Sequence, residues 1–168
     1  MPLTPATEAD IAEVSKQLGR PARDIVAIAA RCVCGKPLVV QTSPRLGDGT
    51  PFPTTYYLTH RGATAAVSTL EASGLMAQYQ QRLADEPEFA AAYQAAHEAY
   101  LADRALIGGE QVDEIAGISA GGMPTRVKCL HALVGHALAA GPGVNLVGDL
   151  ALAACSWSPK ICTCDNFV

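Results

Sequence analysis

The sequence is poor in charged and aromatic residues, and it lacks long apolar runs. Charged residues make up 17% of the 168 positions, and aromatic residues make up 5%. Apolar runs such as residues 25–30 (IVAIAA) are far too short to cross a bilayer, so no membrane span is expected. A net charge of −4 argues against nucleic acid or an anionic membrane as a partner. The composition that remains, 49% hydrophobic, is typical of one compact domain with a single core.

Large side chains are also scarce, with three Met and one Trp against 15 Gly. The core is therefore expected to rely on close backbone packing. The first ten residues, MPLTPATEAD, lack a basic stretch followed by an apolar core, so no secretory signal is expected and the cytoplasm is the predicted location. In such a reducing compartment six cysteines are not expected to form structural disulfides. Metal ligation, redox chemistry or simple burial remain open for them.

The first third of the chain reads as one helix followed by strands. Thr7 is the expected N-cap of a helix that ends near Leu18, because Ile11, Val14 and Leu18 recur at helical spacing. Strands are predicted over residues 23–33, 38–42 and 54–59, with a turn at 35–37 and a loop at 44–53. These segments predict a small three-stranded antiparallel sheet.

Helical patterns dominate from residue 62 onward. Helices are predicted over residues 63–73, 75–84 and 86–107, then a loop to residue 122, a helix from Pro124 to about residue 140, and a short one ending near Cys155. Residues 1–6 and 156–168 are expected to be irregular ends. The sequence thus predicts a single α+β domain over 1–168, in which five or six helices pack on the sheet.

Residues 121–143 (GGMPTRVKCLHALVGHALAAGPG) form the most distinctive stretch. Pro124 suits a first helical turn, and the Gly-Pro-Gly at 141–143 ends the helix. A helix this apolar is expected to be buried, so its few polar side chains need partners. These are Arg126, Lys128, Cys129, His131 and His136.

Three clusters carry groups that zinc prefers: Cys32 with Cys34, Cys129 with His131 and His136, and Cys162 with Cys164. On a regular helix Cys129 and His131 point to opposite sides, and Cys129 and His136 lie roughly 10 Å apart along the axis. On an extended strand, Cys32 and Cys34 share one face, and Cys162 and Cys164 would do so if the tail is extended.

The expected arrangement therefore brings one or two ligands from the helix to Cys32 on the sheet and to His60 after the third strand. The best candidate ligands are Cys32, Cys129, His131 and His60, with His136 and Cys34 in reserve. Burial in the core is the alternative for each of them. Zinc is favoured over an iron–sulfur cluster.

A second pattern is basic. Gly121 and Gly122 precede the expected helix N-terminus, which is followed by Thr125, Arg126 and Lys128; Arg45 can join them from the sheet side. Free backbone N–H groups and cations at a helix start suit a phosphate or carboxylate. The pattern is neither a Walker A loop nor a GxGxxG fingerprint, and a simple hinge remains the alternative.

Three segments carry a resemblance to a known family. Arg31-Cys32 with Gly35 and Pro37, PRLGDGTPFPTTYYLT at 44–59, and GGMPTRVKCLHALVGHALAAGPGVN at 121–145 resemble the uncharacterised actinobacterial family catalogued as domain of unknown function 501. The resemblance covers about residues 20–155 and implies no reaction. It places Cys32, Cys129 and His131 within family motifs, whereas Cys34, Cys155, Cys162 and Cys164 lie outside the matched positions. The usual gene neighbours (enolase, a septum-formation initiator and an exopolyphosphatase-like enzyme) imply cytoplasmic housekeeping.

Two functions follow as hypotheses. The first is a cytoplasmic metal-binding protein of unknown reaction. The second is an enzyme that binds a phosphorylated or carboxylated small molecule through the glycine loop, Arg126 and Lys128. An unidentified protein partner remains open, since it depends on gene neighbourhood alone.

Overall fold

A computed structural model describes residues 3–109 and 111–167 of the chain. Its strands are β1 (Thr4–Pro5), β2 (Ile25–Arg31), β3 (Pro37–Thr42) and β4 (Tyr56–Leu58). Its α-helices are α1 (Glu8–Leu18), α2 (Arg61–Ala72), α3 (Leu75–Asp85), α4 (Pro87–Ala105), α5 (Leu130–Ala140) and α6 (Leu146–Ala154). Two short 3₁₀ helices, η1 (Asp113–Ile115) and η2 (Cys164–Phe167), complete the described elements. The predicted α+β class is confirmed.

The sheet is antiparallel with the strand order β1-β2-β3-β4. The expectation of three strands is therefore wrong by one, because Thr4 and Pro5 pair with Ile28 and Ala27 of β2. A two-residue segment that contains proline carries no local strand signal. It becomes a strand only because it pairs with β2, which is distant in sequence. Residues that were expected to be an irregular end thus include the edge strand of the sheet.

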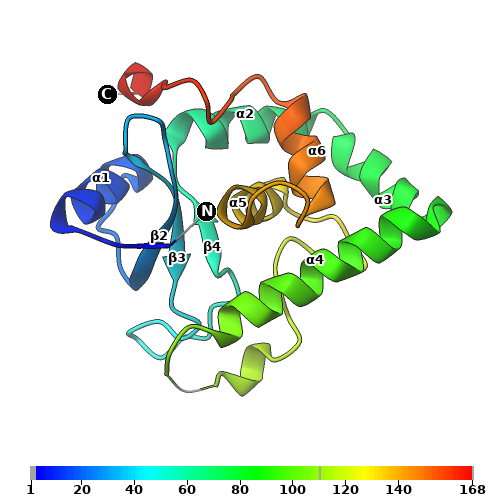
Figure 1. The fold of residues 1–168 in the computed structure, drawn as a ribbon, viewed down its shortest axis with the longest axis horizontal. Helices are drawn as coiled ribbons and strands as arrows, with labels where there is room; N and C mark the ends of the chain where they lie inside the picture. The colour runs from blue at the N-terminus through cyan, green and yellow to red at the C-terminus, as the bar shows by residue number, and fades with distance from the viewer. Residues whose placement is uncertain (1–2, 110, 168) are drawn as a thin grey trace.

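Helix α1 covers one face of the sheet and α5 the other (Figure 1). Val14 of α1 packs with Ile28 and Val40, which lie opposite each other on β2 and β3. The start of α1 follows the prediction, because Thr7 caps the Asp10 amide while the Asp10 carboxylate accepts from the Thr7 amide. This capping box places Asp10 next to the sheet.

Helix α5 is the centre of the larger core, and α2, α4 and α6 surround it (Figure 1). Leu130, Leu133 and Val134 are fully buried, as are Tyr93 and Tyr100 of α4. As the composition predicts, backbone segments pack closely against each other in this core. A Cβ added at Gly135 would lie 3.0 Å from the Tyr56 carbonyl oxygen of β4.

The start of α5 differs from the prediction. The helix begins at Leu130 instead of Pro124. Side chains of neighbouring helices bind the intervening backbone: the Val127 amide donates to Gln80 Oε1 (2.9 Å), and Tyr93 Oη donates to the Arg126 carbonyl (2.8 Å). These tertiary hydrogen bonds hold residues 125–127 outside the helix, which local sequence signals cannot report.

The C-terminal tail turns back over α2 toward the β2–β3 turn (Figure 1). Trp157 is buried in the main core, and its ring lies 5.4 Å from that of His60. The tail therefore joins the body of the domain. Among the described residues, no helix is both long and apolar enough to cross a membrane.

Candidate functional site

The turn between β2 and β3 carries two thiols. The Cys32 amide donates to the Lys36 carbonyl (2.8 Å), and the Gly35 amide donates to the Cys32 carbonyl (2.8 Å). Gly35 has a φ of +93°, a conformation that side-chain-bearing residues rarely adopt. The resulting tight turn lies directly under the C-terminal tail (Figure 1).

Four thiols converge at this turn. The Sγ atoms of Cys32, Cys34, Cys162 and Cys164 all lie within 4.8 Å of one another. The Sγ atoms of Cys34 and Cys164 are 3.5 Å apart. Cys32 is buried, whereas Cys34 and Cys162 are exposed at the rim. Segments 130 residues apart in sequence thus supply two thiols each, and together these can hold one metal ion.

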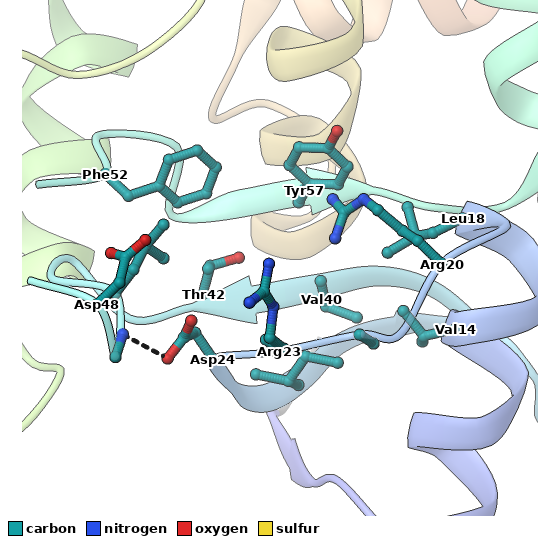
Figure 2. A pocket seen from close by; sticks show the side chains of 14 residues that line it. Val14, Leu18, Arg20, Arg23, Asp24, Val40, Thr42, Asp48, Phe52 and Tyr57 are labelled. Atoms are coloured by element: carbon teal, nitrogen blue, oxygen red, sulfur yellow. Dashed lines mark hydrogen bonds between the residues drawn. The ribbon is translucent and has the colours of Figure 1, made fainter. Parts of the chain in front are cut away.

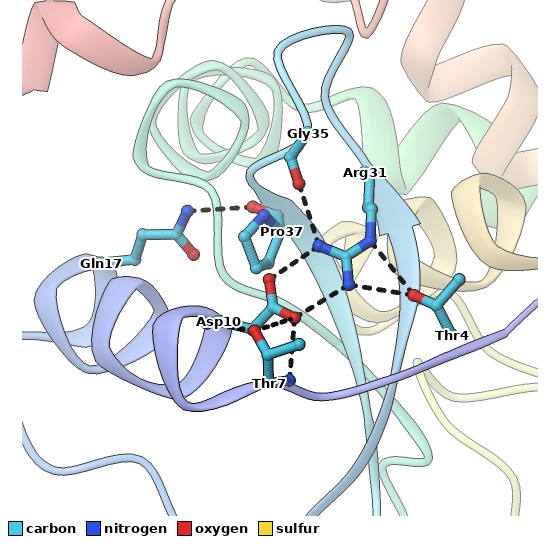
Figure 3. Close-up of polar contacts among 7 residues, drawn as sticks. All are labelled: Thr4, Thr7, Asp10, Gln17, Arg31, Gly35 and Pro37. Carbon is cyan, nitrogen blue, oxygen red and sulfur yellow. Dashed lines mark hydrogen bonds and ion pairs between the residues drawn. The ribbon is translucent and has the colours of Figure 1, made fainter.

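An ion-pair network fixes the base of this turn (Figure 3). The Arg31 guanidinium donates to both carboxylate oxygens of Asp10 (2.7 and 2.9 Å) and to Thr4 Oγ1. It also donates to the Gly35 carbonyl at 2.9 Å, inside the thiol-bearing turn. Hydrogen bonding from Arg31 holds the pKa of Asp10 far below its usual value, against the opposing effect of burial. Arg31 thereby connects α1, β1 and the turn.

A salt bridge also joins the tail to the turn. Lys36 Nζ lies 3.3 Å from Asp165 Oδ1 and 4.0 Å from Glu13 Oε1. These surface pairs contribute little stability individually. They place a positive charge beside the thiol group, which would carry negative charge when ionised.

His60, a predicted metal ligand, lies beside the four thiols. It is the N-cap of α2, and its Nδ1 accepts a hydrogen bond from the Ala63 amide (3.2 Å). A neutral imidazole whose Nδ1 accepts carries its proton on Nε2, which lies 3.4 Å from Cys164 Sγ. Burial lowers the pKa of His60 and so favours this neutral form. The geometry makes His60 a hydrogen-bond donor to Cys164.

Cys129 and His131 belong to a separate group with Glu71 of α2. Glu71 Oε1 accepts from the Leu130 amide (2.8 Å) and lies 3.0 Å from His131 Nδ1. His131 Nε2 lies 3.2 Å from the Thr64 carbonyl oxygen. Ser68 Oγ also lies 3.2 Å from Nε2, and a hydroxyl can donate or accept. Because the carboxylate and the carbonyl can only accept, the arrangement suits a cationic imidazole that donates from both ring nitrogens. The ligand atoms of Glu71, Cys129 and His131 lie within 4.8 Å of one another and could hold a metal ion, but a cationic His131 would first have to lose a proton to offer a lone pair.

The electrostatics of this group agree with its hydrogen bonding. Cys129 and Glu71 raise the pKa of His131 to about 9, although burial opposes them. Burial raises the pKa of the Cys129 thiol. Hydrogen bonds from His131 and from the Ala132 amide lower this pKa by more than burial raises it, so the net shift is downward. The two residues thus favour a thiolate next to an imidazolium.

His136, the remaining predicted ligand, is fully buried inside the core. Its ring stacks on Tyr56 at 5.7 Å and meets Tyr100 edge-on at 5.0 Å. Asn145 Nδ2 lies 3.0 Å from His136 Nδ1 and donates to it. Burial lowers the pKa of His136 to about 4, so the ring is neutral. The structure gives it a packing role away from the thiols.

The predicted anion site has a different geometry from the one expected. Because α5 starts at Leu130, Gly121 and Gly122 do not precede a helix N-terminus, and the Leu130 amide already binds Glu71. The Gly121 carbonyl accepts from the Lys128 amide, and a Cβ at Gly122 would lie 2.5 Å from the Arg126 carbonyl oxygen. The glycines therefore close a compact turn that contains Thr125. Arg45 pairs with Glu114 at 2.9 Å instead.

Arginines gather at a different place, a hollow of about 570 Å³ between α1, the sheet and the loop after β3 (Figure 2). Val14 and Val40 line its base, and Phe52 and Tyr57 form one wall, with ring centroids 6.3 Å apart. The side chains of Arg20 and Arg23 also line this hollow (Figure 2). Its rim includes Asp24, whose Oδ1 accepts from the Gly47 amide (2.9 Å).

The predicted ligand set did not contain Cys162 and Cys164, although both were recognised as a cluster that could supply ligands. Their spacing is the sequence signal for a shared site, because Cys162 and Cys164 form a Cys-x-Cys pair like Cys32 and Cys34 in the β2–β3 turn. Sequence spacing alone could not show that the tail returns to that turn. The contact depends on the tail packing over α2.

Comparison with known proteins identifies the family alone. A family model described as protein of unknown function (DUF501) matches residues 28–153. No curated protein and no solved structure matches the chain. The matched region contains Cys32, Cys34 and the Cys129 group, and it ends before Cys162 and Cys164.

Proposed function

Because this chain belongs to the DUF501 family, whose function is unknown, we propose its function from the site: it binds one zinc ion through four cysteines. The ligands are Cys32, Cys34, Cys162 and Cys164. The observation that carries the proposal is the convergence of their four sulfur atoms. Zinc in such a site links the β2–β3 turn to the C-terminal tail.

The sulfur spacing supports a single ion. Four thiolates at about 2.3 Å from one tetrahedral zinc ion lie about 3.8 Å from each other. The four Sγ atoms within 4.8 Å of one another need only small shifts to reach this geometry. An iron–sulfur cluster spreads its thiolates over more than one iron ion and so requires wider spacing. This comparison favours zinc over a cluster.

The surroundings suit thiolates that bind metal. Cys164 faces the His60 Nε2–H, and Lys36 supplies a positive charge next to the tail. Such outer hydrogen bonds orient and stabilise metal ligands. Since protein thiolates would fill all four tetrahedral positions, the site resembles structural zinc sites more than catalytic ones. A reducing compartment such as the cytoplasm would keep the thiols available.

Metal analysis of the full chain purified without oxygen tests the proposal. We expect about one zinc per chain and no visible absorption. Cys34→Ser and Cys162→Ser should each lose most of the zinc, because three thiolates hold the ion far less tightly. Cys155→Ser and Cys129→Ser are matched controls, since neither residue belongs to the four-thiol group.

Each other outcome has a definite meaning. Metal-free protein from cells grown with ample zinc and iron would overturn the proposal. Equal loss of zinc from Cys129→Ser and Cys34→Ser would also overturn it, because it would move the site to α5. Stoichiometric iron would refute zinc as the metal, and the same serine variants would still test the four ligands.

A second candidate function is binding of an anionic small molecule, and the hollow in Figure 2 favours it. In the described part of the chain, neither the Arg20 nor the Arg23 side chain forms an ion pair or a hydrogen bond with another residue. Two guanidinium groups without an ion pair beside Phe52 and Tyr57 suit a planar ring that carries a phosphate or carboxylate. The Asp24 and Asp48 carboxylates line the same hollow, and Asp48 interacts electrostatically with Arg23, so a bound anion would compete with them.

Calorimetric titration with adenosine monophosphate tests this candidate. Binding should weaken at least about 10-fold in Arg23→Ala and Arg20→Ala, as expected for loss of a charge-assisted contact. Arg126→Ala, in the glycine turn, is the control and should bind normally. Absence of binding, or equal weakening in Arg126→Ala, would contradict the assignment to this hollow.

A further inference from the structure

The group at the start of α5 has features that neither metal binding nor the arginine-lined hollow uses. Cys129 is half-buried and occupies the N-cap position of α5. With His131 and Ala132 it lines a second hollow of about 440 Å³ beside β4. The rest of that lining comes from α1, the β4 segment and α2, and it includes Tyr56, Tyr57 and Thr64.

Hydrogen bonding fixes the charges of the group. His131 donates to the Glu71 carboxylate through Nδ1 and to the Thr64 carbonyl through Nε2. A ligand atom of this imidazolium lies within 4.8 Å of Cys129 Sγ. Glu71 is itself held by the Leu130 amide, so the carboxylate orients the ring. A thiol beside a cationic imidazole at the start of a helix is the usual setting of an activated nucleophile.

The surroundings restrict the chemistry. The Glu71–Cys129–His131 group contains no second cysteine, so it lacks a resolving thiol for disulfide exchange. Apart from Cys129 and His131, the hollow is lined by neutral or apolar side chains. The reacting group of a substrate should therefore be uncharged, as an ester or thioester is. Besides His131 and Glu71, the titratable groups on this side are Tyr56 and Tyr57, which line the hollow, and Tyr93 of α4, whose Oη donates to the Arg126 carbonyl.

We propose that Cys129, His131 and Glu71 form a thiol-nucleophile site that accepts an acyl group from an ester or thioester. The Cys129 sulfur forms a bond to the acyl carbon while the donor's C–O or C–S bond breaks. The electron pair leaves with the alcohol or thiol, which takes a proton from His131 Nε2. Water or a second nucleophile then attacks the thioester on Cys129, and its proton returns to His131. Glu71 is the positioning residue.

Competitive alkylation of the zinc-loaded full chain tests the nucleophile. With limiting iodoacetamide at pH 6, peptide mass spectrometry should find Cys129 labelled at least 10-fold faster than half-buried Cys155. Between pH 8.5 and pH 6 an ordinary thiol slows about 100-fold, whereas Cys129 should slow much less. His131→Asn and Glu71→Gln should restore the ordinary pH profile. Thr69→Ala is the control, because Thr69 is an exposed residue on the same helix as Glu71 and donates to the Ala65 carbonyl.

Acylation tests the substrate class. p-Nitrophenyl acetate should transfer one acetyl group to Cys129, with a matching burst of p-nitrophenol that Cys129→Ser lacks. The wild-type measurements do not depend on variants that fold poorly. Equal alkylation of Cys129 and Cys155 would overturn the nucleophile, and acetylation elsewhere, or none, would overturn the acyl acceptor. Zinc content is measured on the same samples, so failure of the metal proposal is recorded separately.

Discussion

At the scale of single residues, the Arg31–Asp10 pair has the clearest structural role. It joins α1 and β1 to the turn that carries Cys32 and Cys34 (Figure 3). The Asp10 side chain is only 10% exposed, and the Arg31 side chain is 29% exposed. A bidentate pair with this little exposure is worth more than a typical surface salt bridge.

Asp10→Asn should lower the free energy of unfolding at pH 7 by about 1.5–3 kcal/mol, the usual range for hydrogen bonds to charged groups. Arg31 depresses the pKa of Asp10 in the folded state, so this stabilisation is complete above the unfolded value near 3.8. It is lost as the pH falls below that value. Urea denaturation of both proteins at pH 7 and pH 3 should therefore show a smaller difference at pH 3.

Exposed Asp113 provides the control for this comparison. Asp113→Asn should unfold like the wild type at both pH values. A stability difference for Asp10→Asn that grows on acidification would contradict the assigned direction of the pKa shift. The measurement would then point to stabilisation of protonated Asp10.

Contacts of single residues also explain why the predicted ligands His131 and His136 do not belong to the four-thiol group. His136 is surrounded by Tyr56, Tyr100 and Asn145, and both His131 nitrogens donate to oxygen atoms. The sequence identified these residues as polar groups that needed partners. Both His131 nitrogens and His136 Nδ1 have them, whereas His136 Nε2 has no hydrogen-bond partner among the described residues. The sequence could not show that the partners are protein atoms, because Glu71 belongs to α2 and Asn145 caps α6.

At the scale of elements, the C-terminal tail is the segment whose position should depend on metal. Its anchors are the two thiols, the Lys36–Asp165 pair and buried Trp157. Surface ion pairs are weak. The metal therefore should be the main link between the tail and the β2–β3 turn.

Removal of zinc by a chelator should release the tail. Trp157 is the only tryptophan and is 7% exposed, so its fluorescence should shift to longer wavelength as water reaches the ring. Amide hydrogen exchange should accelerate over residues 158–166, whereas α5 amides stay protected by the core. Unchanged tryptophan emission and exchange after complete zinc loss would show that packing alone holds the tail.

A variant supplies the control for the chelator experiment. Cys162→Ser should reproduce the shift without chelator, because it removes one ligand from the tail side. Cys155→Ser should retain the wild-type spectrum, although Cys155 is nearer to Trp157 in sequence. Its Sγ lies 3.1 Å from the Trp157 carbonyl oxygen and outside the thiol group.

At the scale of the whole molecule, the sheet separates two environments. On the α1 side lies the hollow with Arg20 and Arg23, and on the α5 side lies the main core. The four thiols lie at one end, where the β2–β3 turn meets the tail (Figure 1). The Cys129 group lies near the start of α5, where α2 supplies Glu71. The molecule thus keeps its two sulfur sites apart.

The sequence by itself determined the element types and most of their order. Helical spacing and caps predicted α1, and the helical patterns over residues 63–73, 75–84 and 86–107 correspond to α2, α3 and α4. These signals are local, because a helix or strand is specified by residues within a few positions of each other. The family motifs were equally readable, and the match over residues 28–153 confirms the resemblance.

Tertiary structure alone decided three features. Strand β1 exists because β2 lies beside it, and α5 starts late because Gln80 and Tyr93 bind the preceding backbone. The grouping of the cysteines required the tail to return over α2 to the β2–β3 turn. Each feature depends on contacts between segments distant in the chain, and such contacts leave no periodic signal in either segment alone.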